Sequence, residues 1–182
     1  MRKVRYSVAA SLDGYIAASN GSVDWLNRFR EDVPGEDFGM TAFFKTVDTV
    51  LMGRKTYEIA LKMGMEKSGM PGLANYVFSR TLPAGQRDGV TFVADGVGDL
   101  LAGLKKKPGK DIWLCGGGEL AREALREGAL DEIRVAVIPI LIGSGIQTFA
   151  TGFPETKLRL LECKQYKGGV TELVYAAGNK ER

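Results

Sequence analysis

The sequence predicts an α/β fold, in which one mixed, mostly parallel central sheet has helices on both faces and antiparallel C-terminal strands. Short apolar runs alternate with segments of helical spacing through most of the chain, which is typical of parallel strands joined by helices. Towards the C-terminus, β-branched runs follow one another without a helix between them. Three consecutive glycines, Gly116–Gly118, separate one predicted strand from one predicted helix.

Length and composition predict a single domain over residues 1–182. The chain is 45% hydrophobic and has no long proline- or serine-rich tract. It can therefore bury one sizeable core, whereas two domains of half this length would each be small.

The first part of the chain predicts a strand, a loop and a helix–strand–helix unit. Apolar residues alternate at period two over Val4–Ala10, which indicates a strand. A polar, glycine-containing segment then runs to about Gly35. Apolar spacing predicts a helix over Phe38–Val47, a buried strand over Thr49–Met52 and a helix over Arg54–Met63.

The second part of the chain contains the glycine turn and ends in a predicted hairpin. Its predicted elements, in order, are strands at Asn75–Phe78 and Val90–Val93, a helix at Asp99–Lys107, a strand from Asp111 to Cys115, a helix after Gly118, a strand at Asp131–Ile140, and a hairpin of Leu158–Tyr166 with Val170–Ala176.

Charge and residue content exclude several classes of function. The net charge of +3 is mild, and the densest basic run, Lys105–Lys107, has no aromatic residue interleaved with it. A solvated helix end explains this run better than a nucleic-acid surface does. The absence of histidine excludes serine–histidine and cysteine–histidine nucleophiles and histidine-ligated metals. We expect neither a nucleic-acid partner nor a bound metal.

The two cysteines and the N-terminus favour a reduced, cytoplasmic protein. Cys115 and Cys163 have neither C-x-x-C spacing nor a basic setting, so we expect both to be buried structural thiols. Arg5 and Asp13 interrupt the short apolar segment near the N-terminus. No run approaches the ~20 apolar residues that span a bilayer, so no membrane partner is expected.

The glycine turn predicts an anion-binding site. Glycine lets the backbone approach a ligand closely, and a helix N-terminus offers unpaired N–H groups to a group such as a dinucleotide pyrophosphate. A Walker A loop is excluded, because Glu119 and Leu120 stand where Lys-Ser/Thr is required. A Rossmann fold is disfavoured, because no acidic residue lies about twenty positions on, within Val135–Ile140.

Two further strand ends are candidates for phosphate binding. Gly53-Arg54-Lys55-Thr56 again joins a strand to a helix start, and Ser79-Arg80-Thr81 follows another strand. Each alone also fits a helix cap or a solvated arginine. Three such strand ends in one sheet can converge on one extended polyanionic ligand.

Five motifs follow one another along the chain: Ser11–Ala17, Leu51–Tyr57, Val77–Leu82, Trp113–Leu120, and Leu130–Ile133 leading to Pro139–Gly145. In this order they resemble the dihydrofolate reductase-like family, in particular the C-terminal reductase domain of the bifunctional riboflavin-biosynthesis protein RibD. The resemblance spans Val4–Tyr175, without the zinc motif of the deaminase half. It implies a dihydrofolate reductase-like three-layer fold in a stand-alone form, with NADPH as cofactor.

The resemblance also implies which residues bind NADPH. The pyrophosphate would lie at the glycine turn, formed by Gly116, Gly117, Gly118, Glu119 and Leu120, and the Gly116–Gly117 peptide is the candidate for an unusual cis bond. The adenosine side would be held by Gly53, Arg54, Thr56, Ser79, Arg80 and Thr81. Two guanidiniums near the 2′-phosphate would favour NADP over NAD. Ala9, Ile16 and Cys115 would lie beside the nicotinamide; all three also fit a plain core, and for Cys115 the two interpretations are equal.

For the proton that follows a hydride, the resemblance points to Asp37, at the predicted start of a helix. Its context departs from the family pattern, because Gly39 and Met40 occupy the following turn and Ala136 replaces the threonine that partners the carboxylate. These departures count against folate as the substrate. An aspartate at this position is also commonly an N-terminal cap.

The resemblance implies a reductase of a small heterocyclic substrate, either pterin-like or a ribosylaminopyrimidine. Arg28, Arg30 and Lys45 are candidate cations for a ribose 5-phosphate. The family and the apolar C-terminal strands predict a homodimer. Two alternatives stay open: a nucleotide- or flavin-binding module without turnover, and an interaction protein that only retains the fold.

Overall fold

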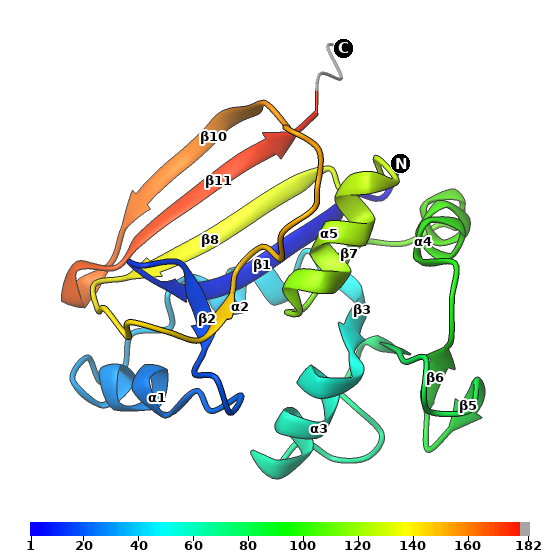
Figure 1. Cartoon of the computed structure of the whole chain (residues 1–182), viewed down its shortest axis with the longest axis horizontal. Helices are drawn as coiled ribbons and strands as arrows, with labels where there is room; N and C mark the ends of the chain where they lie inside the picture. The colour runs from blue at the N-terminus through cyan, green and yellow to red at the C-terminus, as the bar shows by residue number, and fades with distance from the viewer. Residues whose placement is uncertain (179–182) are drawn as a thin grey trace.

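The computed structural model describes residues 1–178, which are organised around one twisted sheet (Figure 1). Within these residues nine strands follow the spatial order β10-β11-β8-β1-β7-β3-β4-β6-β5. Their bounds are β1 Val4–Ser11, β3 Val47–Gly53, β4 Ala74–Phe78, β5 Gly85–Arg87, β6 Val90–Val93, β7 Asp111–Leu114, β8 Glu132–Ile138, β10 Leu158–Gln165 and β11 Thr171–Ala177.

The sheet is mixed and mostly parallel, as the sequence predicts. The central strands pair in parallel, β1 with β7 and β8, β3 with β7 and β4, and β4 with β6. Strand β11 runs antiparallel to β8 and to β10, and β5 runs antiparallel to β6. The predicted antiparallel C-terminal edge is therefore confirmed.

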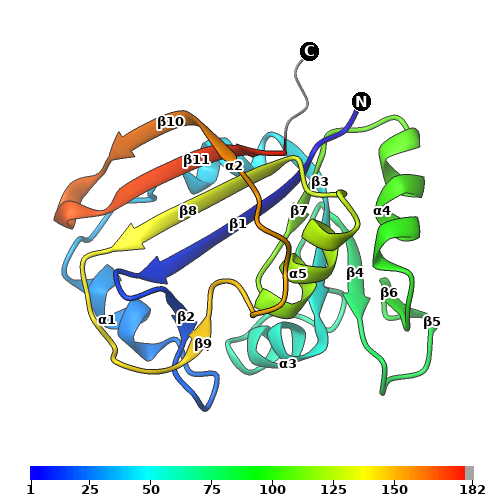
Figure 2. The same ribbon diagram turned by 45° about the horizontal axis from the view of Figure 1, so that its top comes forward.

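Helices cover both faces of the sheet and create three layers (Figure 2). Alternate residues of β1, such as Val4 and Tyr6, are fully buried with α4 and α5. On the opposite face, Trp113 of β7 packs in a second cluster with α2 and α3. The helices are α1 Asp24–Glu31, α2 Met40–Phe44, α3 Arg54–Lys62, α4 Val97–Lys106 and α5 Gly118–Arg126.

The segment between β1 and α2 differs most from the prediction. Helix α1 occupies part of the predicted polar loop, and its Trp25 is buried beside Ile138 and Val170. The helix predicted over Phe38–Val47 shrinks to Met40–Phe44. Positive φ angles at Phe38 and Gly39, 51° and 72°, turn the chain immediately before this helix.

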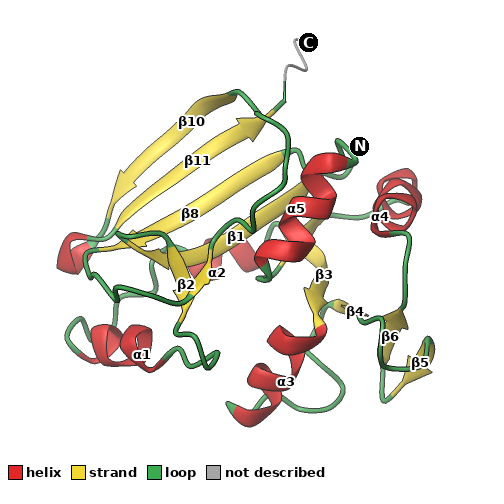
Figure 3. Ribbon diagram, in the orientation of Figure 1, coloured by secondary structure: helices red, strands yellow, loops and turns green. Residues whose placement is uncertain are grey.

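Two short pairings were not predicted from the sequence. Strands β2, Tyr15–Ala17, and β9, Ile146–Gln147, form a separate two-stranded sheet; Figure 2 labels both strands, and Figure 3 gives the view by secondary structure. Strand β5 is exposed throughout and lacks apolar alternation. The predicted strand Asp131–Ile140 is shorter, because β8 ends at Ile138 immediately before Pro139, which has no N–H to donate.

The two cysteines have different environments. Cys163 lies on the edge strand β10 and is exposed, which corrects the expectation of a buried thiol. A strand whose eight residues are all exposed provides no core for it. Cys115 is partly buried at the end of β7. Among residues 1–178, no helix is long and apolar enough to cross a membrane, and no cluster of three or more side chains suits a metal.

Candidate functional site

A cleft of about 1600 Å³ lies at the carboxyl ends of the parallel strands. Ligands of open α/β sheets bind at this edge, where the strands end and the helices begin. The fifteen residues expected to bind the cofactor or to act in catalysis all line this cleft, namely Ala9, Ile16, Asp37, Gly53, Arg54, Thr56, Ser79, Arg80, Thr81, Cys115, Gly116, Gly117, Gly118, Glu119 and Leu120.

The glycine turn joins β7 to α5 through two residues with positive φ, 67° at Gly116 and 85° at Gly117. A Cβ at Gly116 would lie 3.3 Å from the Thr56 hydroxyl, so the turn packs closely against α3. At Gly117 the nearest atom would be the Leu120 Cβ, at 3.7 Å. The backbone at Gly117 therefore has room to meet a ligand.

Gly118 has a different reason to be glycine. A Cβ there would lie 2.8 Å from the Gln147 carbonyl oxygen and 2.9 Å from the Ala150 backbone nitrogen. The first residue of α5 therefore packs directly against the backbone of Gln147 and Ala150, which leaves no space for a side chain. The peptide bonds of residues 1–178 are all trans, so the expected cis bond at Gly116–Gly117 is wrong, and the positive φ angles turn the chain instead.

Helix α3 provides a second N-terminus at the cleft. Gly53 is extended, with φ −76° and ψ 158°, and a Cβ on it would meet no atom within 4 Å. Arg54 follows it, and its Nη1 lies 2.7 Å from Glu58 Oε1, one turn further along. The Arg54 side chain stays 34% exposed, so its guanidinium borders both Glu58 and the cleft.

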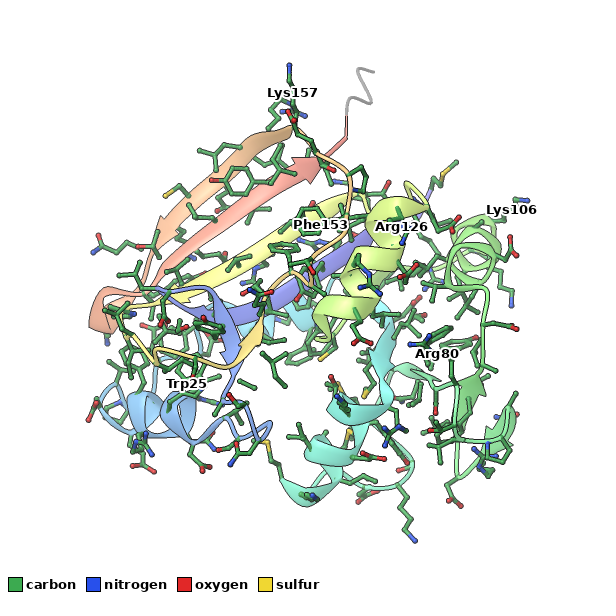
Figure 4. All side chains as sticks on the ribbon, in the orientation of Figure 1. Trp25, Arg80, Lys106, Arg126, Phe153 and Lys157 are labelled. Carbon is green, nitrogen blue, oxygen red and sulfur yellow. The ribbon has the colours of Figure 1, made fainter. Side chains whose placement is uncertain are left out.

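The end of β4 is shaped by a buried hydroxyl. Ser79 is 3% exposed, and its Oγ accepts hydrogen bonds from the backbone N–H of Leu82 at 2.9 Å and of Thr81 at 3.3 Å. This bonding tightens the turn and leaves the side chains of Arg80 and Thr81 exposed on the cleft rim. Figure 4 shows Arg80 beyond the end of β4.

A third helix start lies on this rim, and although the sequence predicts this helix from Asp99, it was not expected to belong to the site. Helix α4 begins at Val97 after Gly96, whose φ is 68°, and residues 94–99 line the cleft. Asp95 and Asp99 are exposed there, opposite in charge to the arginines. The helix begins two residues earlier than predicted, after Gly96 rather than after Gly98.

A flap formed by β2 and β9 closes another side of the cleft, with Ile16, Ile146 and Gln147 among the lining residues. The flap is held by Asp13, whose carboxylate accepts hydrogen bonds from the backbone N–H of Gly143 and of Ile142. The Ser11 hydroxyl donates to the same carboxylate at 2.6 Å. These hydrogen bonds, that of Ser11 first, lower the pKa of Asp13.

The apolar lining of the cleft includes Ala9 and Cys115. Burial raises the pKa of the Cys115 thiol to about 12. The group stays protonated at physiological pH, which removes it as a nucleophile and agrees with the inert thiol predicted from the sequence.

Asp37 lines the cleft and caps α2 from outside its first turn. Its Oδ1 accepts from the Gly39 N–H at 2.9 Å, and its Oδ2 accepts from the Thr41 N–H at 3.1 Å. The hydrogen bond with the Thr41 side chain, and then these backbone bonds, lower the pKa of Asp37. The carboxylate is therefore ionised at neutral pH, which suits an acceptor or an electrostatic role better than that of a proton donor.

The end of the cleft beneath β8 and β11 holds charged residues that the sequence did not single out. Arg134 on β8 and Glu172 on β11 line it and form a buried ion pair. Of the three cations considered for a phosphate, Arg30 lines the cleft, whereas Arg28 and Lys45 lie outside it. Ala136, in the place of the family's threonine, also lines this end.

Comparisons with known proteins agree with this architecture. The family model of the RibD C-terminal domain matches residues 2–171. Protein YwjB of Bacillus subtilis (strain 168) is 41% identical over 175 residues, which cover 96% of this chain and 97% of YwjB.

Two solved structures show the same fold. The crystal structure of a "Putative riboflavin biosynthesis protein" from Shewanella sp. PV-4 is 28% identical with a TM-score of 0.80, over 98% of this chain and 100% of that one. RibD of Acinetobacter baumannii is 20% identical with a TM-score of 0.70, over 97% of this chain and 58% of that chain.

Proposed function

Because the chain belongs to the RibD C-terminal domain family, we propose that it is an NADPH-dependent reductase that transfers a hydride to a small heterocyclic substrate. One observation carries the proposal: the glycine turn, the start of α3 and the Ser79–Thr81 turn, which are distant in sequence, line one cleft. Family membership supports the reaction class, and this convergence supports the choice of residues.

The cleft residues fit the parts of NADPH. The open backbone at Gly117 and the N-terminus of α5 suit the pyrophosphate, because unpaired N–H groups there attract anions. Arg54 and Arg80 are cations on the rim where the adenosine phosphates would lie, and charge-assisted hydrogen bonds to a 2′-phosphate favour NADPH over NADH. Ala9, Ile16 and Cys115 offer an apolar wall for the nicotinamide. When bound, NADPH would supply the hydride.

The chain itself would position the substrate and exclude water. The flap that Asp13 holds narrows the cleft on the nicotinamide side. Asp37 is the proposed catalytic residue. As an ionised carboxylate it would accept a hydrogen bond from an N–H of the substrate and stabilise the positive charge that the ring gains when water protonates it, and the hydride would then neutralise that charge.

The choice of substrate follows the family. The proposed substrate is pterin-like or a ribosylaminopyrimidine, as for 5-amino-6-(5-phosphoribosylamino)uracil reductases. Of the three cations considered for a ribose 5-phosphate, Arg30 is the one that lines the cleft. Titrating the protein with NADPH and NADH, and then following NADPH oxidation with a panel of these heterocycles, tests the proposal. Absence of NADPH binding would refute it.

A second candidate is a nucleotide- or flavin-binding module without turnover. It is favoured by Asp37, because both of its carboxylate oxygens already accept hydrogen bonds from the backbone. NADPH binding without oxidation across the whole panel would favour this alternative.

We also infer a homodimer formed through the bare part of the sheet. Figures 1 and 2 show no helix over the side of β8, β11 and β10 that faces the viewer. On β10, Leu158 and Leu160 are 43% and 51% exposed, an unusual density of apolar surface for an edge strand. A second copy that presents the same strands would cover this surface.

A further inference from the structure

The ion pair at the substrate end of the cleft is buried from solvent. Arg134 and Glu172 side chains are only 8% and 5% exposed, although both residues line the cleft. Arg134 Nη2 forms the ion pair with Glu172 Oε2 and also donates to the Phe38 carbonyl at 3.3 Å. The guanidinium lies over the Phe43 ring, 4.8 Å from its centroid, which fixes its plane.

Each partner of this pair keeps unused hydrogen-bonding capacity. Within residues 1–178, Arg134 Nη1 meets only the thioether sulfur of Met40, at 3.8 Å, and thioethers are weak acceptors. Glu172 Oε1 accepts only a long hydrogen bond, 3.4 Å, from the Tyr166 hydroxyl. A strong donor and a strong acceptor therefore lie side by side with poor partners.

Stability alone does not explain such a pair. Apolar residues of similar volume in place of a buried ion pair are often neutral or stabilising, because the charges lose their hydration. The neighbouring cleft residues, Ala9, Ala136 and Ile138, are small or apolar and leave space above the sheet. The pair thus adds a fixed donor and a fixed acceptor beside small and apolar residues, the arrangement by which ligand sites fix orientation.

We propose that the Arg134–Glu172 pair selects the substrate by binding the edge of a neutral ring in which a carbonyl lies beside an N–H, as in a cyclic amide. The carbonyl would accept from Arg134, and the N–H would donate to Glu172. An anionic group would be repelled by the carboxylate and a cationic group by the guanidinium. The inference rests on the proposed function, because it concerns the substrate side of the same cleft.

The test uses lumazine, a fluorescent dioxopteridine with ring N–H groups beside its carbonyls, and 1,3-dimethyllumazine, in which methyl groups replace the N–H hydrogens. Both are titrated into the protein saturated with NADP⁺, which cannot deliver a hydride. The wild-type protein should bind lumazine at least about tenfold more tightly than the dimethyl compound, because a hydrogen bond to a charged group is lost.

The variant Arg134→Met/Glu172→Met removes the pair without leaving a lone buried charge. It should lose the preference for lumazine while its NADP⁺ affinity stays unchanged. The matched control is Arg5→Met/Glu132→Met. It removes another ion pair, with Arg5 Nε 2.6 Å from Glu132 Oε1, and Glu132 lies on β8 two residues before Arg134 but outside the cleft. This control should bind lumazine as the wild type does.

Arg134→Lys provides a second variant that keeps the charge of the pair. It lacks the planar fork that can serve Glu172 and a ligand together, so the preference for lumazine should again fall. A wild-type protein that binds both lumazines equally, or a double variant that keeps the preference, would overturn the proposal. If NADP⁺ does not bind, the proposed function fails, and the lumazine titrations without nucleotide still decide the role of the pair.

Discussion

The carboxylate of Asp13 accepts a hydrogen bond of 2.7 Å from the backbone N–H of Gly143, so the loop after β1 holds the loop after β8. The two residues are 130 positions apart in the chain. The same carboxylate accepts from the Ser11 hydroxyl, which ties the contact to the end of β1. One ionised side chain therefore joins the two loops that lead into the flap formed by β2 and β9.

Loss of this charge should loosen the flap at low pH. The hydrogen bonds that Asp13 accepts lower its pKa below the ordinary value of 3.8, so its stabilising effect is full above that value and is lost as the pH falls through the lowered pKa. The difference in melting temperature between the wild type and Asp13→Asn should therefore shrink between about pH 4 and pH 2. A pH-independent difference would contradict this assignment.

Substitution at two adjacent glycines should separate ligand binding from folding. Gly117→Val should abolish NADPH binding, because its branched side chain would fill the space open to the pyrophosphate. The positive φ adds about 1–2 kcal/mol of strain, which Gly117→Ala controls for. Gly118→Ala should instead lower the melting temperature, because its Cβ meets the Gln147 and Ala150 backbone. Normal NADPH affinity in Gly117→Val would place the phosphates elsewhere.

Arg80→Ala should reduce the preference for NADPH over NADH by about tenfold or more, since a charge-assisted hydrogen bond contributes about 1.5–3 kcal/mol. The side chain is exposed, so the melting temperature of the free protein should stay the same. Dissociation constants for both nucleotides give the ratio. Arg126→Ala, an exposed arginine outside the cleft, is the matched control. Equal losses for NADPH and NADH would argue against a 2′-phosphate contact.

Asp37→Asn should lower the rate of single-turnover NADPH oxidation by about 10²- to 10⁴-fold if the carboxylate acts on the substrate. Asparagine is also a good cap, so α2 should persist and NADPH affinity should change little. Because the pKa of Asp37 is lowered, the carboxylate stays ionised throughout the neutral range. Its titration should therefore cause no change in the wild-type rate at those pH values. An unchanged rate in the variant would leave Asp37 with the capping role alone.

Leu160→Glu should convert the proposed dimer to a monomer, because it places a charge on the bare face of β10. Sedimentation equilibrium measures the change in mass. Leu141→Glu is the control, since Leu141 is 68% exposed but lies on the loop after β8. A wild-type protein that sediments as a monomer would exclude the dimer, and a dimeric Leu160→Glu variant would move the interface to another surface.

The features predicted correctly from the sequence are those with local causes. Glycine followed by helical spacing marks the starts of α3 and α5, and the parallel sheet brings these starts to one edge without further information. The buried Ser79 turn has an equally local cause, a hydroxyl that caps the following residues. For this reason every cofactor residue expected from motifs lies in the cleft.

The features that the sequence did not reveal depend on contacts between distant segments. Arg134 and Glu172 meet only because β11 returns antiparallel to β8, with Glu172 paired to Ala136. Neither residue belongs to a motif. Strands β2 and β9 are too short to show a period, and their pairing is fixed by contacts made through Asp13. The trans Gly116–Gly117 bond shows that resemblance to a family does not by itself predict whether a given peptide bond is cis or trans.

The different surroundings of Gly117 and Gly118 expose them to different selection. Exchange of Gly118 would disturb packing against backbone, and natural variation at that site is constrained by the need to fold. Gly117 borders open space, so apart from its positive φ it would be constrained by the proposed pyrophosphate rather than by packing. If the proposal holds, a homologue with glycine at the position of Gly118 but a side chain at that of Gly117 would keep the fold and lose the nucleotide. The pair therefore serves as a marker for sorting lineages of this fold that have lost their cofactor.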